Sequence, residues 1–219
     1  MALALETNRQ DFQGLFTLYM IIAGVVAALV LGTMAYAIIR YRRRDGATAK
    51  EVRGLKPLEG AWIAVIAVIV VVLLVSTFRT EDRVVAISGD PAQTVRVHAF
   101  QWGWRFAYPG TGIAITGNRR RLPTLVMPAE VPVRIELTSR DVIHSFWVPE
   151  LRFKRDAFPD RTTTFDLVVD PGVTTTGRCA EFCGLDHDNM DFQVVSMPQS
   201  EFERWLRSHE RRSASGGAA

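Results

Sequence analysis

The chain of 219 residues is long enough for one domain of ordinary size and a further segment. Its two cysteines exclude a small fold held by many disulfides, but they are compatible with one disulfide or one metal site. The formal net charge is only +3, so the distribution of charges along the chain is more informative than their sum.

The N-terminal part contains two long stretches without a charged residue, residues 12–39 and 60–78. Each is long enough for a helix across a bilayer, which takes about 20 apolar residues. The segment between them carries seven Arg or Lys residues and three acidic ones, and clustered positive charge marks the cytoplasmic side. Residues 1–80 are therefore expected to form a transmembrane helical hairpin with a basic cytoplasmic loop. The N-terminus and everything after the hairpin would lie on the outer, periplasmic face of a bacterial cell membrane.

Two alternatives for this hairpin fit the sequence less well. Residues 1–11 carry more acidic than basic side chains, unlike the start of a cleaved signal peptide, and the apolar run that follows is too long for one. A buried hairpin of a large soluble protein would not need uncharged stretches of this length.

Residues 81–198 alternate between apolar and polar side chains. TVRVHAFQW places Val95, Val97 and Ala99 on one face, and VPVRIELTS and TTTFDLVVD alternate in the same way. A period of two indicates half-buried strands, and Pro and Gly residues interrupt them at turns. We expect an all-β Greek-key domain here, followed in residues 199–219 by a short amphipathic helix and a disordered tail.

The segment RCAEFCGLDHDNM, residues 178–190, holds both cysteines, one histidine and one methionine. A disulfide is the usual state of two cysteines outside the cytoplasm, but between Cys179 and Cys183 it would close a very small loop and leave His187 and Met190 unexplained. A structural zinc site would use two thiolates and two histidines, with no role for methionine. Copper suits cysteine, histidine and methionine together.

A copper site of this kind needs a second histidine. His144, in the apolar segment DVIHSFWVPE, is the candidate, although a lone histidine there would more often be a core residue. With Cys183, His187 and Met190 it makes the ligand set of a mononuclear blue-copper site. Cys179 then remains, and a second thiolate on the same loop allows two sulfurs to bridge two copper ions. A backbone carbonyl between the cysteines would complete six donors.

These residues resemble subunit II of the cytochrome c oxidases of the heme-copper family, with its dinuclear copper A (CuA) centre. The resemblance covers nearly the whole chain, a two-helix hairpin followed by a cupredoxin-like domain with CAEFCGLDHDNM as its ligand segment. It implies that the sixth copper ligand is the carbonyl oxygen of Glu181, and that the Glu181 side chain reaches a magnesium ion at the interface with subunit I.

Three other segments carry the resemblance. FQWGWRF resembles the aromatic stretch over the copper site, which implies that Trp102 accepts the electron from cytochrome c and that Trp104 packs in the core. LEGAW implies that Glu59 lies at the mouth of a proton-uptake path into subunit I. FKRDAFPDR implies that Lys154 and Asp156 face subunit I. The ordinary alternatives are core or interfacial packing for Trp102 and a helix-start charge for Glu59.

The expected electron donor differs from that of many relatives. The stretch RFAYPGTGIAITG after Trp104 lacks the acidic residues with which mitochondrial-type relatives bind a basic cytochrome c, and only Asp141 remains. This departure from the family pattern therefore implies a less basic cytochrome or a membrane-tethered one.

The implied function is that of the electron-accepting subunit of an aa3-type cytochrome c oxidase. Such a chain takes electrons from cytochrome c at the dinuclear copper centre and passes them to a heme in subunit I, where oxygen is reduced to water and protons are pumped. Alone it would catalyse nothing. The expected partners are subunit I, subunit III and cytochrome c, with no nucleic acid. The expected cofactors are two copper ions and a shared magnesium ion, and the hemes belong to the partner subunit only.

Four rival functions can be told apart by specific features. A quinol oxidase subunit II would lack the copper ligands that this sequence has. The two-helix hairpin and Glu59 favour an oxygen-reducing complex over a nitric oxide reductase. A copper-delivery protein would expose its ligands and release the metal, and a purely structural membrane protein would hold a disulfide.

Overall fold

The computed structural model of the chain describes residues 8–42, 54 and 56–216. The chain divides into two compact units, Gln13–Asp82 on the one hand and Met1–Phe12 with Arg83–Ala219 on the other. Most of the predicted cytoplasmic loop lies outside the described residues.

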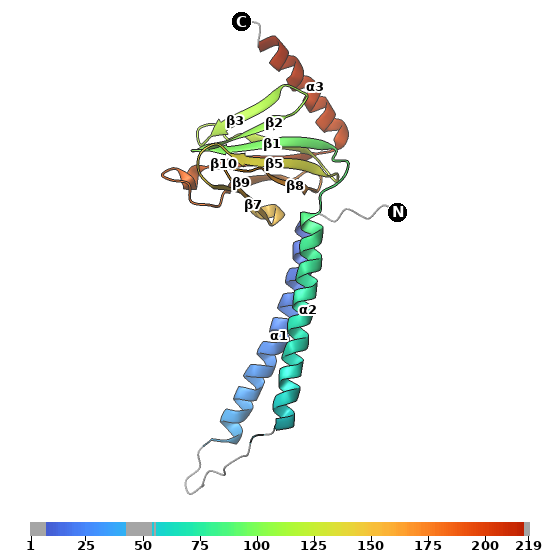
Figure 1. Ribbon diagram of the computed structural model, residues 1–219, viewed down its shortest axis with the longest axis vertical. Coiled ribbons are helices and arrows are strands. Elements are labelled where there is room, and N and C mark those ends of the chain that lie inside the picture. Colours follow the sequence, from blue (N-terminus) through green and yellow to red (C-terminus); the bar gives the residue numbers. More distant parts are fainter. Residues whose placement is uncertain (1–7, 43–53, 55, 217–219) are drawn as a thin grey trace. The chain divides into compact units, whose positions relative to one another are not determined.

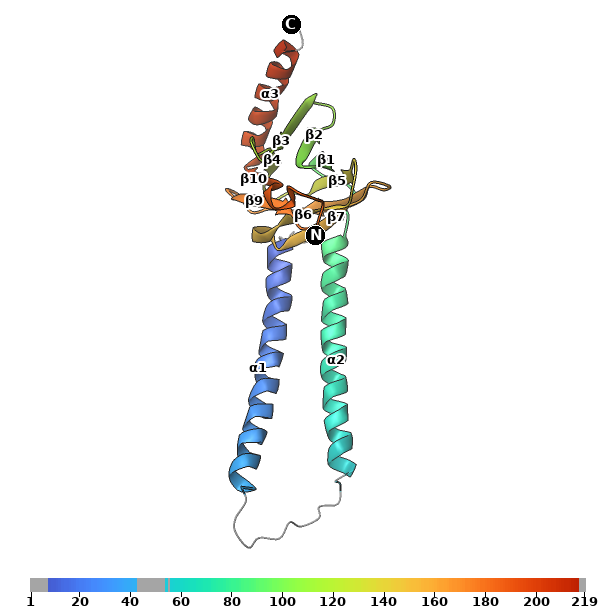
Figure 2. The ribbon, with the colours of Figure 1, turned by 90° about the vertical axis from the view of Figure 1, so that its left-hand side faces the viewer.

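Two long helices dominate the N-terminal part (Figures 1 and 2). Helix α1 is Asn8–Arg40, of 33 residues, and α2 is Lys56–Val85, of 30 residues. By length and composition both can cross a membrane. No residue of α2 is buried, and the hydroxyl groups of Tyr19 and Thr77 link the two helices at 2.8 Å. The prediction of two long apolar helices is confirmed, and their exposed apolar surface suits contact with lipid or with other membrane helices.

The β domain is a sandwich of two five-stranded sheets. The first sheet, in spatial order, contains β3 (Ile113–Asn118), β2 (Gly103–Tyr108), β1 (Gln93–Phe100), β5 (Val133–Ser139) and β8 (Thr163–Leu167). The second contains β4 (Thr124–Pro128), β10 (Asp191–Met197), β9 (Thr174–Cys179), β6 (His144–Val148) and β7 (Phe153–Ala157). Strands β1 and β5 are parallel, as are β4 and β10, and the other pairs are antiparallel. The expected all-β architecture is confirmed.

The predicted alternation of buried and exposed residues holds in β1 and β5 but fails at one position of β8. The β1 residues Val95, Val97 and Ala99 are fully buried. In β8, however, Asp166 is only 8% exposed. It forms a short ion pair with Arg134 on the neighbouring strand β5, and Arg134 also donates to the carbonyl of Ser88. Cross-strand pairing therefore allows a charged side chain in a nearly buried position.

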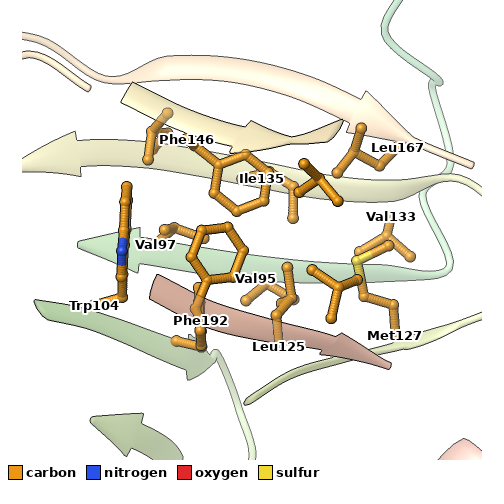
Figure 3. Packing of buried hydrophobic residues seen from close by; sticks show 14 of the residues in the cluster. Val95, Val97, Trp104, Leu125, Met127, Val133, Ile135, Phe146, Leu167 and Phe192 are labelled. Atoms are coloured by element: carbon orange, nitrogen blue, oxygen red, sulfur yellow. The ribbon is translucent and has the colours of Figure 1, made fainter. Parts of the chain in front are cut away.

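The core lies between the two sheets, and Figure 3 shows the inward-facing side chains. Trp104 contacts Phe146 and Phe192 edge to face, and the rings of Phe146 and Phe192 stack with centroids 4.8 Å apart. Such pairs add to the stabilisation that comes from the burial of the rings. All three rings are fully buried, which confirms Trp104 as a core residue.

Helix α3, Gln199–Gly216, follows the last strand. Its Phe202 and Trp205 pack against Tyr108 of β2, with ring centroids 6.3 Å and 5.1 Å away. The amphipathic helix is confirmed, but it continues through residues 213–216, which were expected in the disordered tail. An apolar helical face that is anchored on the sandwich supports the turns that follow it.

At Gly177 of β9 the core has no room for an added side-chain atom. A Cβ at this position would overlap the ring of Phe192, which is the paired residue on the neighbouring strand β10. Gly177→Ala should therefore lower the free energy of unfolding by about 1–3 kcal/mol. Urea unfolding followed by tryptophan fluorescence measures this change. The matched control is Gly89→Ala, whose Cβ would meet no atom within 4 Å. Equal stability of the two variants would contradict this account of the core.

Candidate metal centre

The two sheet strands that carry His144 and Cys179 are neighbours. His144 is the first residue of β6 and Cys179 the last of β9, and β6 pairs with β9 through Phe146 and Cys179. The segment 179–190, here called the ligand loop, then returns to β10. It ends with Met190, whose carbonyl oxygen accepts a hydrogen bond from the backbone N–H of Cys179. The loop lies at one end of the sandwich, on the left in Figure 1 and toward the viewer in Figure 2.

The six predicted donors converge at this end. The sulfur atoms of Cys179 and Cys183 are 3.9 Å apart, and both cysteines are free. Cys179 Sγ lies 3.8 Å from His144 Nδ1 and 3.3 Å from the carbonyl oxygen of Glu181. Cys183 Sγ lies 3.5 Å from Nδ1 of the loop histidine and 3.9 Å from Sδ of the loop methionine.

The donors differ in burial. His144 and Met190 are fully buried, and Cys179 and Cys183 are 6% and 3% exposed. One ligand atom each of His144, Cys179 and Cys183 lies within 4.8 Å of the others, which is close enough to hold a metal ion. His187 is half-buried. The site therefore lies just below the surface, and the imidazole of His187 forms part of its edge.

A carboxylate fixes the orientation of His144. Asp141 Oδ1 accepts a hydrogen bond from Nε2 of His144 at 2.8 Å, which leaves Nδ1 directed at Cys179. Asp141 Oδ2 in turn accepts from the backbone N–H of Gln101 at 2.7 Å. Partial burial would raise the pKa of Asp141, but the hydrogen bonds from Gln101, His144 and Val142 lower it. A carboxylate behind the second ring nitrogen is the usual way to hold a metal-binding histidine.

The pKa values of the two thiols are shifted in opposite directions. Burial raises the pKa of Cys179, but hydrogen bonds from His144 and from backbone groups outweigh it and bring the pKa to about 7. Burial and the adjacent charge of Cys179 raise the pKa of Cys183 to about 12. Burial lowers the pKa of His144, yet its contacts with Cys179 and Asp141 raise it overall. A metal ion that binds both sulfurs must therefore displace protons from the site.

Two tryptophans hold the ligand loop through its backbone. Trp102, in the turn between β1 and β2, is half-buried, and its indole N–H donates to the carbonyl of Cys183 at 3.2 Å. Trp104 donates to the carbonyl of Met190 at 3.1 Å from within the core. Gly184 has a φ of +116°, and a Cβ there would lie 3.1 Å from the Trp102 ring. A side chain at this position would therefore be strained.

The other side chains singled out from the sequence contribute no donor to this cluster. Glu59 is in the first turn of α2, and it belongs to the other compact unit. Lys154 and Asp156 lie on β7, where Lys154 Nζ is 3.7 Å from Asp156 Oδ1. The Glu181 side chain is exposed while its carbonyl faces Cys179.

Three contacts in the site were not predicted. The first is the hydrogen bond between Asp141 and His144. The second is the bond that Gln101 donates to the Cys183 carbonyl at 2.7 Å, and the third is the bond from Trp104 to Met190. The spacing of Asp141 three residues before His144 is the one sequence signal that pointed to a partnership.

Two protein-family models match the chain. The model described as "Cytochrome C oxidase subunit II, periplasmic domain" matches residues 93–197. The one described as "Cytochrome C oxidase subunit II, transmembrane domain" matches residues 4–80. Together they cover both the helical part and the sandwich.

Curated relatives and a solved structure agree with these matches. A probable cytochrome c oxidase subunit 2 of Streptomyces avermitilis is 32% identical over 232 residues, covering 86% of this chain and 72% of the relative. A cytochrome c oxidase subunit 2 of Synechocystis sp. is 29% identical over 261 residues, covering 95% and 75%. The periplasmic domain of subunit II of the Bradyrhizobium japonicum cytochrome oxidase superimposes with a TM-score of 0.52 at 26% identity, covering 57% of this chain and 99% of that domain.

These matches confirm the fold class, which is a pair of apolar helices followed by a cupredoxin-like β-sandwich. They also confirm that the domain, with its His and Cys cluster, is of the CuA type. The chain belongs to the cytochrome c oxidase subunit II family, and it is a two-span membrane subunit of a heme-copper oxidase.

Proposed function

We propose that this chain is the subunit at which electrons enter an aa3-type cytochrome c oxidase. It takes single electrons from cytochrome c and passes them to a heme in subunit I, where oxygen is reduced to water and protons are pumped. The observation that carries the proposal is the convergence of two thiols, two imidazoles, one thioether and one carbonyl at one end of the sandwich.

The donor set fits two copper ions. The sulfur atoms, at 3.9 Å, are much farther apart than the roughly 2.05 Å of a disulfide. Thiolates together with imidazole and thioether favour copper over zinc or magnesium. The proposed ligands are His144, Cys179, Glu181 through its carbonyl, Cys183, His187 and Met190. When bound, the copper pair supplies a one-electron redox couple whose charge is shared by two metals.

Burial of the ligands supports electron transfer over copper delivery. His144 and Met190 are fully buried and are held by neighbouring strands. A delivery protein needs ligands that a recipient can reach, whereas an electron-transfer site benefits from ligands that stay in place in both oxidation states.

Trp102 is the proposed point at which the electron arrives. Its ring is partly exposed to solvent, and its N–H is hydrogen-bonded to the backbone of the proposed ligand Cys183. It therefore offers a short path from the surface to the site. The core position of Trp104 does not offer such access from outside.

Further roles rest on the resemblance to the family. We propose that the exposed Glu181 side chain binds a magnesium ion shared with subunit I, and that Lys154 and Asp156 face the same subunit. Glu59, at the start of α2, would lie at the mouth of a proton path.

The positive charge of residues 40–59 supports a cytoplasmic loop, and with it a β domain and N-terminus on the outer face of a bacterial membrane. The partners would be subunits I and III and a cytochrome c.

The hydrogen bond between Asp141 and His144 yields a first test. Asp141→Asn removes the charge that orients and polarises the imidazole, so the affinity for copper should fall by about 10–100-fold. A competition titration with a copper chelator measures it. The control is Asp160→Asn, because the side chain of Asp160 is 71% exposed and forms an ion pair with the exposed Arg161. An unchanged affinity in Asp141→Asn would mean that His144 is held without Asp141 or does not bind the metal.

The position of Trp102 yields a second test. In the purified oxidase, Trp102→Phe should slow the oxidation of reduced cytochrome c by at least about tenfold, equivalent to ~1.4 kcal/mol of activation free energy. Copper content should stay unchanged, because Gln101 still donates to the carbonyl of Cys183. Stopped-flow spectroscopy measures the rate. Trp205→Phe on α3 is the control, since Trp205 packs against Tyr108 and Phe202. Wild-type rates in Trp102→Phe would exclude this tryptophan as the point of arrival.

A further inference from the structure

Trp102 is bordered by arginines that lack acidic partners. We call the following five residues the basic rim: Arg105, Arg119, Arg120, Arg121 and Arg140. All are exposed except Arg105, which is half-buried. The rim lies on the first sheet and its connecting turns, at the same end of the sandwich as the ligand loop.

Strand register places one part of the rim beside Trp102. In the antiparallel pair of β2 and β3, Gly103 lies opposite Asn118. Trp102 directly precedes Gly103, and the arginine run 119–121 directly follows Asn118. Asn118 and Arg121 then form a bridge, so Arg119 and Arg120 are at the tip of a tight turn. Both segments therefore leave the paired strands at the same edge.

The other two rim residues lie near the end of β1 and on β2. The backbone N–H of Arg140 donates to the carbonyl of Ala99 near the end of β1. Arg105 pairs with His98 across β1 and β2. The pKa of His98 is lowered, first by its burial and then by the positive charges of Arg140, Arg105 and Arg96. These guanidinium groups are therefore close enough to raise the local potential.

The rim charges are not neutralised within the described part of the chain. None of the five arginines forms an ion pair with a described residue, whereas Arg96 and Arg134 of the same sheet pair with Glu136 and Asp166. Neighbouring like charges repel each other, and a partner of opposite charge removes that cost.

The acidic residues near Trp102 are either engaged in hydrogen bonds or lie on the ligand loop. Asp141 is already engaged by His144 and by the backbone of Gln101. Glu181, Asp186 and Asp188 are exposed members of the ligand loop. The first-sheet side of Trp102 is thus basic, and apart from Asp141 these acidic groups lie on the ligand loop, which joins β9 and β10 of the second sheet.

We propose that the electron donor of this chain docks on the basic rim through an acidic surface that surrounds its exposed heme edge. This proposal rests on the proposed function and names the charge of the partner. One electron leaves the ferrous heme of the donor, which becomes ferric, and the copper site is reduced by one electron through Trp102. Complementary charge accelerates the encounter and orients the heme toward Trp102.

The test uses the purified oxidase complex and one cytochrome in two charge states. The probes are a basic mitochondrial-type cytochrome c and the same protein after succinylation, which replaces its surface ammonium groups by carboxylates. Their oxidation is followed while the ionic strength rises from about 0.01 M to about 0.15 M, over which the screening length falls from about 30 Å to about 8 Å. The rate with the succinylated cytochrome should fall with added salt, and the rate with the basic cytochrome should not.

The triple variant Arg119→Gln, Arg120→Gln, Arg121→Gln should slow the oxidation of the succinylated cytochrome at low salt by about tenfold, because steering by charge changes association rates by 10-fold or more. Electron delivery from the small donor tetramethylphenylenediamine should be unchanged. The matched control neutralises Arg204, Arg207 and Arg211 on α3, which lies at the other end of the sandwich from the ligand loop in Figure 1. This control removes the same charge and should leave the rate as in the wild type.

Three outcomes would overturn the proposal. If the basic cytochrome is the faster donor and loses its rate with salt, the donor surface is basic and the acidic residues of the ligand loop are the dock. If the triple variant is purified without subunit I, the rim is a subunit contact. If neither cytochrome nor the small donor is oxidised, the proposed function itself fails, and the docking proposal fails with it.

Discussion

The site depends on one constraint, which is that six donor atoms keep their positions although they come from two separate parts of the chain. The pairing of β6 with β9 brings His144 to Cys179. Hydrogen bonds from Gln101 and Trp102 to Cys183, and from Trp104 to Met190, hold the ligand loop through its backbone. Because these bonds use backbone carbonyls, the sulfur atoms remain available to a metal. A rigid donor set of this kind changes little when the oxidation state changes.

The same contacts connect the surface to the core. Trp102 and Trp104 are two residues apart on one hairpin, yet the first is partly exposed and the second is packed against Phe146 and Phe192. The core therefore orients the hairpin, and the hairpin holds the loop. A packing change at Phe192 would reach the loop through a single hydrogen bond, so stability and electron transfer share one set of residues.

Much of this could be predicted from the sequence, because composition and periodicity are local properties. The uncharged runs indicated the helices, the period of two indicated β1 and β5, and the chemistry of Cys, His and Met indicated copper. The burial of Asp166 could not be predicted, since its partner Arg134 lies on another strand. The same is true of the arginines that gather around Trp102. Both features depend on strand register, which a single sequence does not reveal, whereas the spacing of Asp141 three residues before His144 is visible in the sequence.

The central claim is that both cysteines bind a pair of copper ions. The most direct measurement is the copper-to-protein ratio of the purified chain together with its electron paramagnetic resonance spectrum. The account predicts two coppers per chain and a seven-line hyperfine pattern, because one unpaired electron is shared by two equivalent nuclei. One copper with a four-line pattern would make Cys179 a bystander and contradict the dinuclear site. A copper-free chain with its cysteines joined in a disulfide would contradict the metal centre itself.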